Sequence, residues 1–115
     1  MSNNGNKSRV YVTCETNHDF SMAEEFGSIS FLTADDLNNS KASIHNSKVL
    51  ADIQEKLEEF DPENDWVLVA GSPYISASVF LMLGLMGIDS VKILRWNNRD
   101  FVYQPLYLDL PRGSI

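Results

Sequence analysis

The stretch Asp65-Trp66-Val67-Leu68-Val69-Ala70-Gly71-Ser72-Pro73 opens the part of the chain, residues 65–96, that decides the fold. Its first six residues form an apolar run that predicts a strand, and the glycine, serine and proline after it predict a tight turn. Residues 74–86 are apolar almost throughout and stop at Gly87, so they predict a helix. Residues 90–96 return as a second strand. Strand, helix and strand in this order predict a βαβ unit, whose parallel strands are joined by a right-handed crossover.

Further strands are predicted on both sides of this unit. The runs 9–14 and 28–33 are rich in β-formers, and one helical turn is expected between them, at 22–26. After the βαβ unit, residues 97–100 predict a hairpin loop that leads into a last strand. Because proline cannot donate to a sheet ladder, Pro105 predicts that this strand lies at an edge of the sheet or breaks there.

The two predicted helices differ in character. After a polar loop over 34–46, Asn46 or Ser47 is expected to cap a helix that ends near Phe60 and has one apolar stripe, as in a surface helix. The later helix is apolar around nearly its whole circumference, so it needs a cover besides the sheet, either the first helix or another copy of the protein. Gly84 lies inside it, and close backbone packing would explain a glycine there.

These elements predict a small α/β domain with a mixed, mostly parallel sheet. The sheet is expected to have four to five strands and to end in a C-terminal antiparallel hairpin. The domain also contains two main helices, and its elements follow one another in the order ββαβαββ. At 115 residues the chain is expected to form one domain over 9–110. Residues 1–8 are polar and rich in asparagine, and we expect them to be a disordered tail, with a second tail at 111–115.

The charge is unevenly distributed. Of the 16 acidic and 9 basic residues, 13 acids and 3 bases lie between residues 15 and 65, which gives this stretch a charge of −10 within a chain of net charge −7. An acidic surface repels phosphate backbones, so we expect no nucleic-acid partner. The acidic stretch has two interpretations: a solubilising face, or a surface that docks on a basic protein.

Cysteine use and hydropathy bear on the compartment. The single cysteine, Cys14, allows no intramolecular disulfide and is typical of a reducing setting. The apolar run 75–86 is shorter than the roughly 20 residues that span a bilayer, and the N-terminus has no apolar signal segment. We therefore expect a soluble, intracellular protein without a membrane partner.

The turn at residues 71–73 is the first candidate for a binding site. It joins the carboxyl end of a strand to a helix N-terminus, where ligands of open α/β sheets usually bind. The turn has one glycine, and Pro73 removes a donor, so it matches neither common phosphate-binding loop motif. Ser72 has two interpretations: a helix cap, which we favour, or a contact to an anion or nucleotide.

A second candidate is the cluster of Cys14, Glu15, His18 and Asp19 after the first strand. Successive strand residues point to opposite faces, and no second cysteine or histidine lies at ligand spacing, so neither a nucleophile nor a metal site is favoured. Cys14 is interpreted as a small buried residue, and His18 as a solvated turn residue. Trp96, at the end of its strand, either packs in the core or presents its ring to a partner.

Part of the chain resembles a known group. The run 65–73, the apolar helix, Val91-Lys92-Ile93-Leu94-Arg95-Trp96 and Tyr103-Gln104-Pro105-Leu106 together resemble short proteins of unknown function encoded by tailed bacteriophages. The resemblance covers residues 65–110, with a weaker echo at 9–12 and 26–27. It implies a viral origin and expression in the cytoplasm of a bacterial host, and it transfers no catalytic residue.

Two functions from different classes remain. The first is a non-enzymatic protein that binds a host or phage protein, with homodimer formation as an additional option. The acidic stretch and the all-round apolar helix favour this binding function. The alternative is a module that holds a nucleotide or anionic metabolite at the carboxyl ends of the parallel strands. A small hydrolase is the third interpretation. No catalytic residue, metal or cofactor is expected. The expected contacts to ligand or partner are Thr13, Glu15, Gly71, Ser72, Tyr74, Trp96 and Asn97.

Overall fold

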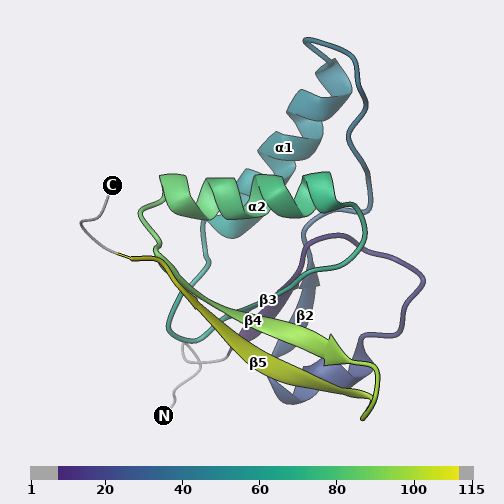
Figure 1. Ribbon diagram of the computed structural model, residues 1–115. Helices are drawn as coiled ribbons and strands as arrows, with labels where there is room; N and C mark the ends of the chain where they lie inside the picture. Colours follow the sequence, from purple (N-terminus) through teal and green to yellow (C-terminus); the bar gives the residue numbers. More distant parts are fainter. Residues whose placement is uncertain (1–7, 112–115) are drawn as a thin grey trace.

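The computed structural model describes residues 8–111 (Figure 1). Its elements are β1 (Arg9–Val12), η2 (Ser21–Glu25, a 3₁₀ segment), β2 (Ser28–Phe31), α1 (Ile44–Leu57), β3 (Trp66–Leu68), α2 (Pro73–Leu85), β4 (Ser90–Asn97) and β5 (Val102–Asp109). Of the predicted tails at 1–8 and 111–115, only Ser8 and Pro111 lie within the described residues. The Ser8 carbonyl accepts a hydrogen bond from the Ser28 N–H.

The sheet has five strands in the order β2-β1-β3-β4-β5. The first four are parallel neighbours, and β5 pairs antiparallel with β4. This arrangement confirms the predicted α/β class, the mostly parallel sheet and the C-terminal hairpin. It also confirms that the strands flanking α2 are parallel neighbours, because Val67 pairs with Ile93 in register.

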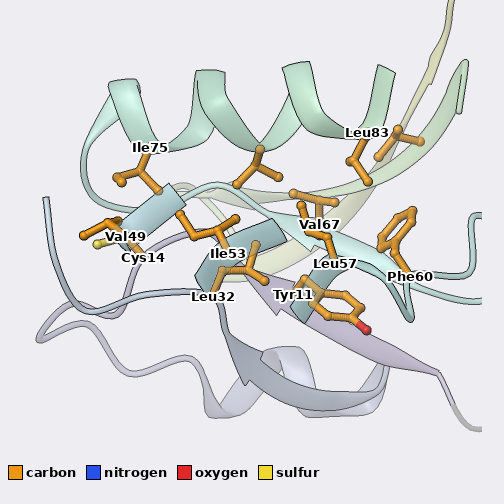
Figure 2. Packing of buried hydrophobic residues seen from close by; sticks show 12 residues of the cluster. Tyr11, Cys14, Leu32, Val49, Ile53, Leu57, Phe60, Val67, Ile75 and Leu83 are labelled. Carbon is orange, nitrogen blue, oxygen red and sulfur yellow. The ribbon is translucent and has the colours of Figure 1, made fainter. Parts of the chain in front are cut away.

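Each face of the sheet has its own core. Side chains alternate along a strand, so Tyr11 points to the side of α1 and α2, whereas Val10 and Val12 point to the side of η2. Figure 2 shows the helix side, where Ile53 and Leu57 of α1 meet residues of α2 and the sheet. Figure 1 shows both helices on one side of the sheet and the short η2 on the other.

The helix α1 begins and ends earlier than predicted. Ser43, not Asn46 or Ser47, is its N-cap, and the Ser43 hydroxyl accepts a hydrogen bond from the Asn46 N–H at 3.1 Å. Phe60 lies beyond the end of the helix, in a turn where its N–H bonds to the carbonyl of Leu57. The polar loop before α1 is therefore shorter than the predicted 34–46. Ser43, Asn46 and Ser47 are all good cap residues within five positions, and sequence alone did not distinguish them.

The helix α2 begins as predicted, with Ser72 as its N-cap and Pro73 in the first turn. Its sheet side buries Ile75, Val79 and Leu83. The helix α1 packs against α2, as one of the two predicted covers, but within residues 8–111 the cover is incomplete, because Leu81 and Leu85 remain 67% and 79% exposed. The explanation for Gly84 by close packing was wrong, since a Cβ atom built there meets no other atom within 4 Å.

The last strand is at the edge of the sheet, as Pro105 predicted, but it does not break. Pro105 pairs with Leu94, and the Leu110 N–H donates to the Asp89 carbonyl just beyond the ladder. In an antiparallel ladder alternate residues bond to the partner strand, so the even-numbered residues of β5 bond to β4. Pro105 belongs to the odd-numbered set, which faces the free edge, and its missing N–H leaves the ladder intact.

Candidate functional site

Thr13 is committed to the fold. It is fully buried where the chain leaves β1. Its hydroxyl donates to the Ala70 carbonyl at 2.9 Å and accepts from the Ala70 N–H at 2.9 Å and the Ser76 hydroxyl at 3.2 Å. One donor and two acceptor positions are the full capacity of a hydroxyl. Thr13 therefore ties β1 to the turn between β3 and α2, with no hydrogen bond left for a ligand.

The turn at Gly71 and Ser72 is tight and capped. Gly71 has a φ of +74°, and a Cβ atom built there would lie 2.9 Å from the Cβ of Cys14, so the loops after β1 and β3 touch at this point. The Ser72 hydroxyl accepts the Tyr74 N–H at 3.2 Å, which is a cap contact. Cys14 is buried, and its burial raises the pKa of the thiol. A protonated, enclosed thiol is a poor nucleophile.

The remaining predicted contacts lie on the surface. The side chains of Glu15 and Tyr74 are exposed, Tyr74 to 70%. Asn97 organises the hairpin, because its side-chain oxygen accepts the N–H groups of Arg99 and Asp100. Of the seven predicted residues, Trp96 and Asn97 line a hollow at the β4–β5 hairpin, and Gly71 and Trp96 line a second cavity.

That cavity has a volume of about 220 Å³ and opens on the η2 side of the sheet, at the carboxyl ends of β3 and β4. Its walls come from the loop after β1, the end of β3 and the β4–β5 hairpin. We call it the aromatic cavity, because four ring-bearing side chains line it: His18, Phe20, Trp96 and Tyr103.

The rings of the aromatic cavity contact one another. The His18 ring lies edge-on to Phe20 and Trp96, with centroid distances of 4.9 and 5.7 Å, and Trp96 lies 4.8 Å from Tyr103. The Nε2 atom of His18 is 3.3 Å from the Tyr103 hydroxyl. Burial, with a smaller effect of the Asp19 carboxylate, raises the pKa of Tyr103. The hydroxyl therefore stays protonated at neutral pH.

Sequence reasoning missed three of these residues as lining of a site. His18 was interpreted as a solvated turn residue, and Phe20 and Tyr103 were not singled out as binding residues. His18 and Tyr103 are 85 positions apart, so no local spacing relates them. One signal in the sequence could have identified the cavity. Ring-bearing side chains occur both in the loop after the first strand and around the last hairpin, and the predicted sheet places these two segments at the carboxyl ends of its parallel strands.

A further hollow lies between α1 and α2 on the outer surface, with a volume of about 400 Å³. We call it the helix groove; the residues that line it are Ser47, Leu50, Ala51, Gln54, Ser78, Leu81, Met82 and Leu85. The half from α2 carries no charge, since residues 73–85 contain no acidic or basic side chain. The half from α1 is bordered by acids, because Glu55 and Glu58 follow Ala51 and Gln54 by one helical turn.

Within residues 8–111, no group of three His, Cys, Asp or Glu side chains is placed to hold a metal ion. Over the same residues, no helix combines the length and the apolar character needed to cross a membrane.

The sheet order, the helices on one face and the cavity at the carboxyl ends of the strands define a small, open α/β protein. The chain belongs to a family of phage proteins: residues 4–110 match the model described as Phage Pam3 gp32-like protein. The resemblance to phage proteins predicted from the sequence is confirmed. No curated protein and no solved structure matches the chain.

Proposed function

We propose that this phage protein is not an enzyme and acts in the host cytoplasm by binding another protein, of the host or of the phage, through the helix groove. The observation that carries the proposal is the exposure of Leu81 and Leu85, at 67% and 79%, on a helix without a charged residue. Large apolar side chains gathered along one groove, unlike scattered ones, are typical of a binding surface.

The charge around the helix groove favours a partner of one kind. Glu55 and Glu58 follow the lining residues Ala51 and Gln54 by one helical turn, and Asp52 is also exposed on α1. Glu59 is paired with Arg9 at 2.8 Å, and Lys48 is the exposed base next to Ser47 of the lining. A partner segment with apolar residues at its centre and Lys or Arg at its ends would match both features. A second copy of this chain would bring acidic surfaces together, so homodimer formation is the less favoured outcome.

The hydroxyl and thiol groups in the loops after β1 and β3 support a role without catalysis. Thr13 has no free hydrogen-bond capacity, and the Ser72 hydroxyl is the cap of α2. The thiol of Cys14 is enclosed and its pKa is raised. No pair of these groups forms the activated nucleophile and base that a small hydrolase needs.

The test is a binding assay with matched surface variants. The tagged full chain is used to capture proteins from infected and uninfected host lysates, and the affinity of each captured protein is then measured for the wild type, Leu81→Glu, Leu85→Glu and Met22→Glu. Met22 is 51% exposed on η2, on the other side of the sheet, and is the control. Affinity at least about tenfold weaker for both leucine variants but unchanged for Met22→Glu supports the proposal.

Two further readouts distinguish the partner. Affinity that falls with added salt and with Glu55→Lys supports a basic partner. Light scattering of the purified chain tests for a homodimer. If a dimer forms and Leu85→Glu dissociates it, the occupant of the helix groove is a second copy of this chain and not another protein. Capture that is equal for all four proteins would contradict the helix groove as the binding surface.

A further inference from the structure

The position of the aromatic cavity follows from the topology of the sheet. After β1 the chain passes to the η2 side, whereas after β3 it passes to the helix side, and β1 and β3 are neighbours. Such a divergence of connections is the place where open α/β sheets form a crevice for a ligand. Here the two loops touch at Cys14 and Gly71, and the cavity opens beside that contact.

The size and lining of the cavity restrict the ligand. A cavity of about 150 Å³ holds a benzene-sized ring in a protein, so about 220 Å³ at an open site is sufficient for a planar molecule of one or two rings. Phe20 and Tyr103 are each only 6% exposed and form a fixed wall, and the exposed His18 lies against them at the mouth. Aromatic walls favour a flat ligand that packs against ring faces or edges.

Hydrogen-bonding groups accompany the rings. The Tyr103 hydroxyl and the Nε2 atom of His18 lie 3.3 Å apart, and both belong to the cavity lining. Thr16 is also in the lining, and its hydroxyl accepts the His18 N–H at 3.2 Å, which leaves its own proton to donate. This mixture of donors and acceptors fits the ring nitrogens and exocyclic groups of a heterocycle better than a hydrocarbon.

Charge excludes phosphate from this site. Among residues 8–111, no Lys or Arg lines the cavity, and the Asp19 carboxylate is near enough to act on Tyr103. The hydroxyl of Thr13, just beyond the end of β1, is fully bonded within the protein. An anionic group would therefore enter without a counter-charge and close to a carboxylate.

We propose that the aromatic cavity binds a planar nitrogen heterocycle of nucleobase size, as the free base or the nucleoside and without phosphate. The ring lies against Phe20, Trp96 and Tyr103, and His18 closes over it from the exposed loop after β1. This site is independent of the helix groove, which lies on the opposite side of the sheet.

The experiment measures binding of adenine, cytosine, adenosine and adenosine monophosphate to the full chain by calorimetry and by tryptophan fluorescence. We expect a base or nucleoside to bind with a Kd below about 1 mM, and the monophosphate to bind at least about tenfold more weakly than adenosine. A Trp66→Phe variant leaves Trp96 as the only tryptophan, so a fluorescence change in it reports the cavity.

Three variants locate the binding. Ala70→Leu fills the cavity, and His18→Ala removes an exposed ring; each is expected to weaken binding about tenfold or more. Tyr74→Ala removes an aromatic ring that is 70% exposed on α2, outside the cavity, and is expected to change nothing. Circular dichroism checks the fold of each variant, and Tyr103→Phe, which deletes one oxygen atom, serves if Ala70→Leu does not fold.

Three results would overturn the proposal. The first is no binding of any base or nucleoside up to its solubility limit. The second is monophosphate binding as tight as that of adenosine, because phosphate recognition would then dominate. The third is binding that survives both Ala70→Leu and His18→Ala. None of these results bears on partner capture by the helix groove, so the two proposals fail separately.

Discussion

The two faces of the sheet are closed by different means. On one face, two helices of 14 and 13 residues bring aliphatic side chains into a cluster whose members are at most 7% exposed. On the other face, the cover is a 3₁₀ segment of five residues and a loop, and aromatic rings fill much of the space. The buried members of both clusters are at most 7% exposed, but the η2 face also opens into the aromatic cavity. We therefore expect the helix face to contribute more stability and the η2 face to bind the small ligand.

The largest effect should come from the centre of the helix face. Ile53 of α1 is completely buried among α2 and the sheet (Figure 2), so Ile53→Ala should lower the free energy of unfolding by about 2–5 kcal/mol. Leu81→Ala removes a side chain that is 67% exposed and should change it by about 0.5 kcal/mol or less. Urea unfolding followed by circular dichroism measures both. Equal losses would show that the outer surface of α2 is covered in solution.

The next effect concerns the point where the loops of the two faces touch. Gly71→Ala places a Cβ atom at a positive φ and 2.9 Å from the Cβ of Cys14, so it should cost about 2–4 kcal/mol. Gly84→Ala is the matched control, because the new Cβ meets nothing and alanine is the better helix residue. It should stabilise the protein by about 0.5–1 kcal/mol. Thermal unfolding of both variants measures these changes. If Gly71→Ala does not lower the stability, the contact between Gly71 and Cys14 has room for a Cβ atom.

The same contrast explains what the sequence could predict. The βαβ unit was predictable because its signals are local: an apolar run, Gly-Ser-Pro, and an uninterrupted apolar helix. The edge position of β5 was predictable because Pro105 lacks a donor. The start of α1 was not, since Ser43, Asn46 and Ser47 are all good caps, and the choice depends on the path of the preceding loop.

The cavity was the least predictable feature. Gly71 and Trp96 were among the predicted contacts because each lies at the end of a strand, but their partners His18 and Tyr103 come from opposite ends of the chain. Periodicity reports which face of an element is apolar and does not report which loops meet. Thr13 and Ser72 have the residue types and positions of a binding loop, yet the fold uses their hydroxyls for its own backbone.

The smallest effect compares one tyrosine on each face. Burial raises the pKa of Tyr11 on the helix face and of Tyr103 on the η2 face, and for Tyr11 the hydrogen bond and charge of Arg9 oppose the increase. A raised phenol pKa means that the folded state holds its proton more tightly. The resulting stability is complete below about pH 10, the pKa of an unfolded tyrosine, and is lost as the pH rises through the folded value. Stability should therefore fall as the pH rises above about 10.

The decline should depend on Tyr103 more than on Tyr11, because Arg9 already favours the ionised form of Tyr11. We expect Tyr103→Phe to reduce the pH dependence of the unfolding free energy in this range, and Tyr11→Phe to reduce it less. Urea titrations of the three proteins at pH 7, 9, 10 and 11 provide the comparison. If Tyr103→Phe leaves the decline unchanged, the Tyr103 hydroxyl is hydrated in solution. The η2 face would then be more open than the rings around the aromatic cavity indicate.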